Sequence, residues 1–111
     1  MAREGEAIPS IDPAVTEAVA TLSRWEIVGR ELTKGFYLKT FNDALGFIND
    51  AAEIANAIQH HPDIVLSEFS TVRFFVKTNE FGKVTMRDVD FAKRVETLWE
   101  GKWQKRAKKV W

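Results

Sequence analysis

The feature that most constrains the fold of this chain is one long amphipathic segment, residues 41–58. Apolar side chains recur along it at intervals of three and four residues, the spacing of one helix face: Phe41, Ala44, Leu45, Ile48, Ala51, Ala52, Ala55 and Ile58. Thr40 can cap the start of this helix, and Pro62 disfavours helical backbone at His61. A helix with so wide an apolar face needs a second layer to cover it.

Segments in which apolar and polar residues alternate flank the long helix and predict that second layer. Two short strands precede it, separated by a turn at Gly29 and Arg30. After it, "EFSTVRFFVKT" is the clearest strand, with Val72, Phe74 and Val76 on one face. The alternating apolar residues of the two earlier strands are Trp25, Ile27, Leu32, Phe36 and Leu38.

Two further helices complete the predicted order. Asp12 and Pro13 suit the start of the first, and Thr85 and Asp88 form a capping-box pattern before the last. The strands are close enough in sequence to form hairpins. We therefore predict an α+β, two-layer fold: an antiparallel sheet of about four strands with three helices on one face. The open face would carry Tyr37, Arg73, Phe75 and Lys77.

Length and composition bound the kind of protein this is. A chain of 111 residues fits one domain, which we place at residues 10–99, between a flexible N-terminus (1–9) and a basic tail (100–111). No cysteine occurs, which excludes disulfides, zinc–thiolate sites and thiol catalysis. The apolar runs are far shorter than a membrane span, and "MAREGEAIPS" lacks the apolar core of a signal peptide. We expect a cytoplasmic protein without membrane contact.

The basic tail, "EGKWQKRAKKVW", has two readings. Five basic residues and one acidic residue give it a net charge of +4, whereas the whole chain is neutral. Tryptophan with arginine and lysine is typical of protein interfaces, so the tail could contact an acidic partner. It could equally extend the last helix, with its lysines in solvent. Nucleic acid is an unlikely partner for a neutral chain. The candidate partner-binding residues are Trp103, Lys105, Arg106, Lys108, Lys109 and Trp111.

The two histidines of the chain, His60 and His61, lie at the predicted exit of the long helix. A histidine there can bond the last free carbonyls and is favoured by the helix dipole. A metal site is poorly supported, because adjacent histidines point apart and no third histidine or cysteine exists. No spacing selects a serine–histidine–aspartate site.

The wider pattern resembles the pterin-4a-carbinolamine dehydratase family. "FYLKTFNDALGF", "HHPD", "FSTVRFFVKT" and "GKVTMRDVDFA" follow one another as in that family, and the resemblance covers about residues 25–99. The positions on the pattern are Phe36, Leu38, Phe41, Ala44, Phe47, His60, His61, Pro62, Asp63, Phe69, Val72, Phe74, Val76, Thr78, Gly82, Thr85, Asp88 and Ala92.

The resemblance implies loss of water from a 4a-hydroxy-tetrahydropterin, with no cofactor or metal. His60 and His61 would shape the pocket and transfer protons, beside Pro62, Asp63 and Thr78. The chain departs from the pattern at two other positions. Asn56 stands where the family usually has an ionisable residue, often glutamate, and Asn79 where it usually has a further histidine, sometimes tryptophan. Asparagine cannot exchange a proton at neutral pH.

These departures suggest a degraded active site. Some family members act by binding proteins, either as a dimerisation cofactor of a transcription factor or as assembly factors for Rubisco in chloroplasts and carboxysomes. The resemblance therefore implies a protein-binding assembly role, most plausibly for Rubisco, slightly ahead of an active dehydratase. It also implies a homo-oligomer, dimer or tetramer, in which a residual pterin could still bind.

Overall fold

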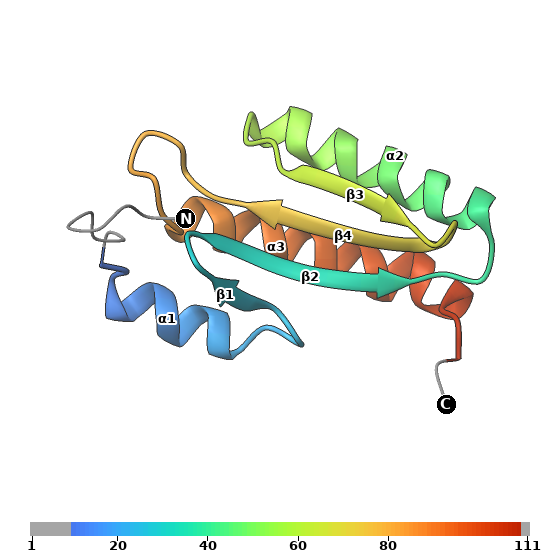
Figure 1. Ribbon diagram of the computed structural model, residues 1–111, viewed down its shortest axis with the longest axis horizontal. Coiled ribbons are helices and arrows are strands. Elements are labelled where there is room, and N and C mark those ends of the chain that lie inside the picture. The colour runs from blue at the N-terminus through green and yellow to red at the C-terminus, as the bar shows by residue number, and fades with distance from the viewer. Residues whose placement is uncertain (1–9, 110–111) are drawn as a thin grey trace.

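The computed structural model describes residues 10–109 of the chain, in which three helices and one four-stranded sheet form an α+β fold (Figure 1). The predicted flexible N-terminus, residues 1–9, lies outside the described part, as do Val110 and Trp111. In chain order the elements are α1 (Pro13–Ala20), β1 (Glu26–Val28), β2 (Glu31–Tyr37), α2 (Phe41–Ile58), β3 (Asp63–Ser67), β4 (Thr71–Val76) and α3 (Met86–Leu98). A π-helical turn (Trp99–Trp103) and a 3-10 turn (Gln104–Arg106) follow.

The sheet has the strand order β1-β2-β4-β3, and every neighbouring pair is antiparallel. Helices α2 and α3 run behind it on one face, and α1 contacts both α3 and β1 (Figure 1). The predicted two-layer, open antiparallel architecture is therefore confirmed. Its inner face is set by register: Leu32 of β2 lies opposite Val76 of β4, and Phe74 of β4 lies opposite Ile64 of β3.

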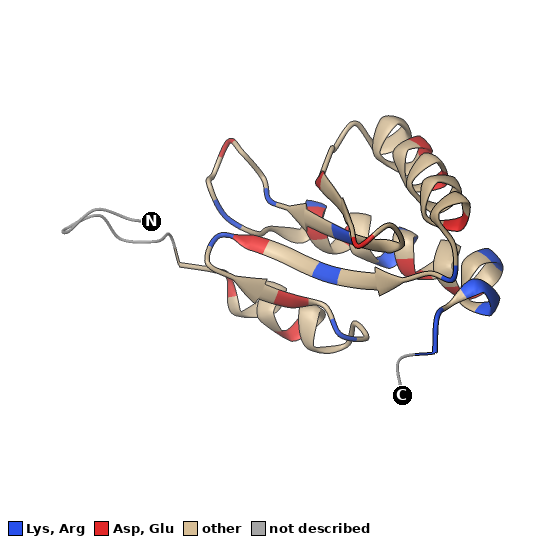
Figure 2. Cartoon of the chain, turned by 45° about the vertical axis from the view of Figure 1, so that its right-hand side comes forward, with Lys and Arg blue, Asp and Glu red and all other residues tan. Residues whose placement is uncertain are grey.

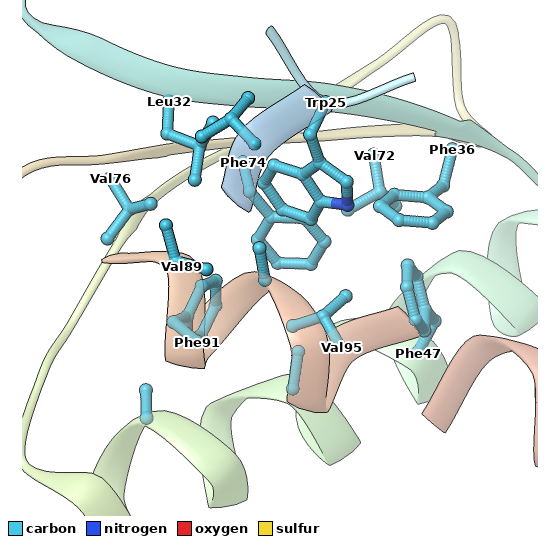
Figure 3. Close-up of a cluster of buried hydrophobic side chains, with 14 of the residues drawn as sticks. Trp25, Leu32, Phe36, Phe47, Val72, Phe74, Val76, Val89, Phe91 and Val95 are labelled. Carbon is cyan, nitrogen blue, oxygen red and sulfur yellow. The ribbon is translucent and has the colours of Figure 1, made fainter. Parts of the chain in front are cut away.

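The core lies between the sheet and the helices (Figure 3). Val72, Phe74 and Val76 are at most 1% exposed, which confirms the prediction that this side of β4 faces the helices. The ring centroids of Phe36 in β2 and Phe47 in α2 lie 5.0 Å apart. Such edge-to-face contacts add about 0.5–1.5 kcal/mol beyond the burial of area. Aromatic residues thus join the two layers.

The helix ends follow the predicted caps. The carboxylate of Asp12 and the hydroxyls of Thr40 and Thr85 each accept a backbone N–H of the following turn. Asp88 completes a capping box with Thr85. Each cap satisfies donors that a helix start leaves unpaired.

The strand expected from residue 68 onward begins later. Glu68 and Phe69 adopt positive φ angles of 48° and 55°, so they form a turn and cannot continue an extended strand. Before this turn, residues 63–67 pair with β4 as the edge strand β3. The His-His-Pro-Asp segment therefore leads directly from α2 into a strand.

Candidate functional site

The end of α2 sends the two adjacent histidines into different environments. Gln59 ends the helix in the left-handed conformation, with φ 51° and ψ 46°. The backbone N–H of His60 still bonds the carbonyl of Ala55, at 3.1 Å. The side chain of His60 turns inward and is 9% exposed, whereas His61 is exposed. One histidine is thus held by the core and the other faces solvent.

His60 is paired with a buried carboxylate. Its Nε2 lies 2.6 Å from Oδ1 of Asp88, which is fully buried. The other oxygen of Asp88 accepts the Thr78 hydroxyl at 2.9 Å and the Thr85 backbone N–H at 2.8 Å. Because a carboxylate oxygen accepts, Nε2 of His60 carries the hydrogen, and Nδ1 of the neutral ring is left to accept a proton. The arrangement fixes both the orientation and the tautomer of the ring.

His61 forms the exposed side of the same site. Its Nε2 donates to Oδ1 of Asn56, one turn back on α2, at 2.9 Å. The two histidines and Asn79 line a polar cavity of about 200 Å³. At its rim Arg87 and Glu80 form an exposed ion pair of 2.8 Å. The full lining is Gln59, His60, His61, Lys77, Asn79, Glu80 and Arg87.

The structure gathers most of the site residues that the sequence suggested. Thr78 enters through its bond to Asp88, and Asn56 through its bond to His61. Pro62 and Asp63 are not among the lining residues; Asp63 instead begins β3 and is exposed.

Asp88 was not predicted as a site residue, although it lies on the family pattern. The Thr85–Asp88 pattern was visible, but a helix cap accounted for it fully. In the structure Asp88 both caps α3 and holds His60. His60 and Asp88 are 28 residues apart, so their spacing in the chain did not predict the contact.

Residues 10–109 hold no group of three or more histidine, cysteine, aspartate or glutamate side chains that could bind a metal ion. No helix in that range is long and apolar enough to cross a membrane. A larger cavity, of about 510 Å³, lies between α2 and α3, with Ile54, Ala57 and Leu98 among its walls. Neither histidine lines it, so it is separate from the histidine cavity.

The described part of the basic tail packs on α2. The indole N–H of Trp103 donates to Asp50 at 2.9 Å, and Arg106 donates to Asp43 at 2.7 Å. Two predicted partner-binding side chains are therefore engaged within the chain. Lys105, Lys108 and Lys109 are exposed, and Figure 2 shows the basic residues along this C-terminal segment in blue. Trp111 lies outside the described residues.

These contacts shift the ionisation of the groups involved. The hydrogen bond from Arg106 lowers the pKa of Asp43 below its ordinary value, and the same bond raises the pKa of Arg106. The hydrogen bond from Lys102 lowers the pKa of Asp50, with a smaller contribution from Trp103. Each carboxylate is stabilised in its charged form by the tail.

Fold and site together define a small α+β protein in which a buried histidine–aspartate pair borders a polar cavity. The chain belongs to the family described as pterin 4 alpha carbinolamine dehydratase, whose family model matches residues 10–98. The site lies within that match.

Individual relatives agree with this membership. A protein of Chromobacterium violaceum is 36% identical over 90 residues, which cover 81% of this chain and 82% of its own length. One of Thermomicrobium roseum is 31% identical over 87 residues, covering 78% and 92%. Both are named "Putative pterin-4-alpha-carbinolamine dehydratase".

Two solved structures are similar to this one. The first is a transcriptional coactivator/pterin dehydratase from Brucella melitensis, with a TM-score of 0.72 and 28% identity, covering 81% of this chain and 98% of its own. The second is a pterin dehydratase-like protein described as a RuBisCO assembly factor in the α-carboxysome. Its TM-score is 0.56 at 19% identity, over 69% of this chain and 88% of its own. At that identity the likeness concerns the fold alone.

Proposed function

We propose that this protein binds a 4a-hydroxy-tetrahydropterin in the cavity at His60 and His61 and removes water from it slowly. The observation that carries the proposal is the buried pair of His60 and Asp88, with 2.6 Å between Nε2 and Oδ1. Buried polar groups are costly unless they are paired, and here the pairing leaves one histidine nitrogen ready to accept a proton.

The reaction needs two proton transfers. A base takes the ring N–H proton, the N–H electrons form a C=N bond, and the C–O bond at the adjacent carbon breaks. The departing hydroxyl takes a proton and leaves as water. His60 suits the role of base, since a neighbouring carboxylate stabilises the imidazolium that forms. His61, on the exposed side of the cavity, suits the role of proton donor.

The two asparagines account for the slow rate that we propose. Asn79 lines the cavity and Asn56 bonds His61, but neither amide can exchange a proton near neutrality. Loss of one general acid or base typically costs about 10²–10⁴ in rate. We therefore expect turnover at least about 10²-fold below that of a relative with ionisable groups at both positions.

The test is stopped-flow absorbance of the 4a-hydroxy-tetrahydropterin as it is consumed. We expect His60→Ala to lower the enzymatic rate by about 10²–10⁴. Asp90→Asn is the control. Asp90 lies on α3, the helix that carries Asp88, but it pairs with Arg94 at the surface, with 3.1 Å between Nε and Oδ2. Circular dichroism of each variant checks the fold. Equal rates for His60→Ala and the unchanged protein would rule out this mechanism.

A second candidate function is a protein-binding assembly role, with Rubisco as the client. It is favoured by Asn56 and Asn79, which stand where ionisable residues would serve catalysis. Lys105, Lys108 and Lys109 would supply an exposed basic surface for an acidic client. In this proposal the protein is cytoplasmic and forms a dimer or tetramer.

This second function predicts a different experiment. Rubisco subunits are refolded with and without the protein, and assembled holoenzyme is counted by native electrophoresis. Changing Lys105, Lys108 and Lys109 to glutamate should abolish any gain in assembly and leave pterin turnover unchanged. If the yield of assembled Rubisco is the same with and without the protein, the assembly role is excluded. Light scattering of the same samples gives the oligomeric state.

A further inference from the structure

The edge of β2 is covered by different segments at its two ends. Strand β1 pairs only with the first residues of β2, ending at the pair Glu26 and Thr33. At the other end, the backbone N–H of Lys108 bonds the carbonyl of Tyr37 at 2.8 Å. Figure 1 shows β1 running along only part of β2, with the C-terminal segment approaching its far end. Between these two covers lies a cavity of about 330 Å³.

Backbone hydrogen-bonding groups of Gly35 face this cavity. In an antiparallel strand the N–H and C=O groups alternate between the two edges from one residue to the next. Tyr37 directs its carbonyl toward Lys108, so Gly35, two residues earlier, directs its N–H and C=O to the same edge. The register of β1 and β2 would place Arg24, two residues before β1, opposite Gly35. Arg24 has a φ of +62° and lies outside the strand. Within the described chain, no strand residue pairs with Gly35 at that edge.

The walls of the cavity combine positive charge with aromatic surface. Arg24, Lys34 and Lys108 line it, together with Phe36 and Trp99, and no aspartate or glutamate of residues 10–109 does. Lys34 is matched by Glu96, at 2.6 Å, and lies 4.6 Å from the centre of the Phe36 ring. Arg24 and Lys108 take part in no ion pair within those residues. Two cations at the mouth are therefore available to an anion.

We infer that this cavity binds a small aromatic carboxylate. The carboxylate would lie at the mouth, between Arg24 and Lys108, within reach of the Gly35 N–H, and the ring would lie against the partly exposed Trp99. Charged donors with an apolar slot fit such a ligand better than a bare inorganic anion, which would leave the aromatic wall wet. A continuous peptide strand fits poorly, because β1 and the Lys108 segment close both ends of the gap. The site is distinct from the histidine cavity, with which it shares no lining residue.

The experiment is a titration of the whole chain, labelled with ¹⁵N, with 2-naphthoate, 2-naphthamide and inorganic phosphate. We expect 2-naphthoate to shift the amide signals of Gly35 and Ala107 and the Trp99 indole signal, and to bind at least tenfold tighter than either other probe. Arg24→Gln with Lys108→Gln should weaken binding at least about tenfold, because both charged partners of the carboxylate are removed. Lys109→Gln is the matched control, because Lys109 is the next residue and is also exposed but does not line the cavity.

Three outcomes would overturn the inference. Equal affinity for 2-naphthamide would show that charge plays no part. Unchanged affinity in the Arg24 and Lys108 double variant would place the ligand elsewhere. Shifts confined to His61 and Asn79 would assign the binding to the histidine cavity. None of these depends on pterin turnover, so failure here leaves the proposed function untouched.

Discussion

The ring of Trp103 rests directly on the backbone of α2 at Gly46. A Cβ built on Gly46 would lie 2.5 Å from Cη2 of Trp103, closer than such atoms approach in proteins. The indole ring also lies 6.2 Å from the ring of Phe47, and its N–H bonds Asp50. A glycine within a helix costs about 1 kcal/mol relative to alanine. The close contact with Trp103 explains why a glycine stands at this position of the helix.

The first prediction reverses the usual effect of alanine in a helix. Gly46→Ala should destabilise the protein by about 1–3 kcal/mol, the typical cost of overpacking, although alanine is the better helix former. Chemical denaturation measures the change. With Trp103→Ala already present, the same substitution should stabilise the protein by up to about 1 kcal/mol. If Gly46→Ala stabilises both backgrounds alike, the tail does not rest on α2 in solution.

The second prediction concerns the aromatic core. Phe74→Ala should cost about 3–5 kcal/mol of unfolding free energy, because Phe74 is fully buried and contacts the rings of Phe36, Phe47 and Phe91. Phe81→Ala is the control, since Phe81 is 59% exposed. It should change stability by less than about 0.5 kcal/mol. Similar losses in the two variants would contradict the observed layering.

The third prediction concerns pH. The pKa values of Asp43 and Asp50 are lowered from 3.8 in the folded chain. Their contribution to stability is therefore complete above the ordinary value and is lost as the pH falls through the lowered ones. Docking of the tail should persist at neutral pH and weaken below about pH 4.

The indole N–H signal of Trp103 reports this docking during an acid titration. In the Asp43→Asn variant the contact with Arg106 should already be weakened at neutral pH. The Trp103 signal of this variant should therefore change less than that of the unchanged protein when the pH falls below 4. Asp90→Asn, on α3, should titrate like the unchanged protein. A Trp103 signal that does not move down to pH 2.5 would show that these carboxylates do not hold the tail.

The fourth prediction concerns the two asparagines of the site. Asn79→His with Asn56→Glu should raise dehydratase turnover, by up to about 10²-fold if proton exchange limits the rate. The conservative pair Asn79→Gln with Asn56→Gln, which restores no ionisable group, should give no gain. Rates are measured by stopped-flow absorbance at neutral pH. A gain from both pairs would indicate an effect of cavity shape rather than of proton transfer.

Much of the fold could be predicted because its signals are local. The caps at Asp12, Thr40 and Thr85 and the alternation along β4 depend on residues a few positions apart. Strand β3 was harder, because residues 63–67 form a short edge strand whose outer side is exposed. The turn at Glu68 and Phe69 requires positive φ angles, and glutamate and phenylalanine do not predict such angles.

Local patterns in the chain were enough to predict the three helices, the strands β1, β2 and β4, the buried face of β4 and the place of His60 at the end of α2, because periodicity and capping are properties of neighbouring residues. The contact between His60 and Asp88, 28 residues away, and the position of Trp103 on Gly46 rather than in solvent follow from the folded arrangement alone. These contacts arise where the ends of separate elements meet. Their partners are chosen by the packing of α2, α3 and the sheet, and no local pattern encodes that choice.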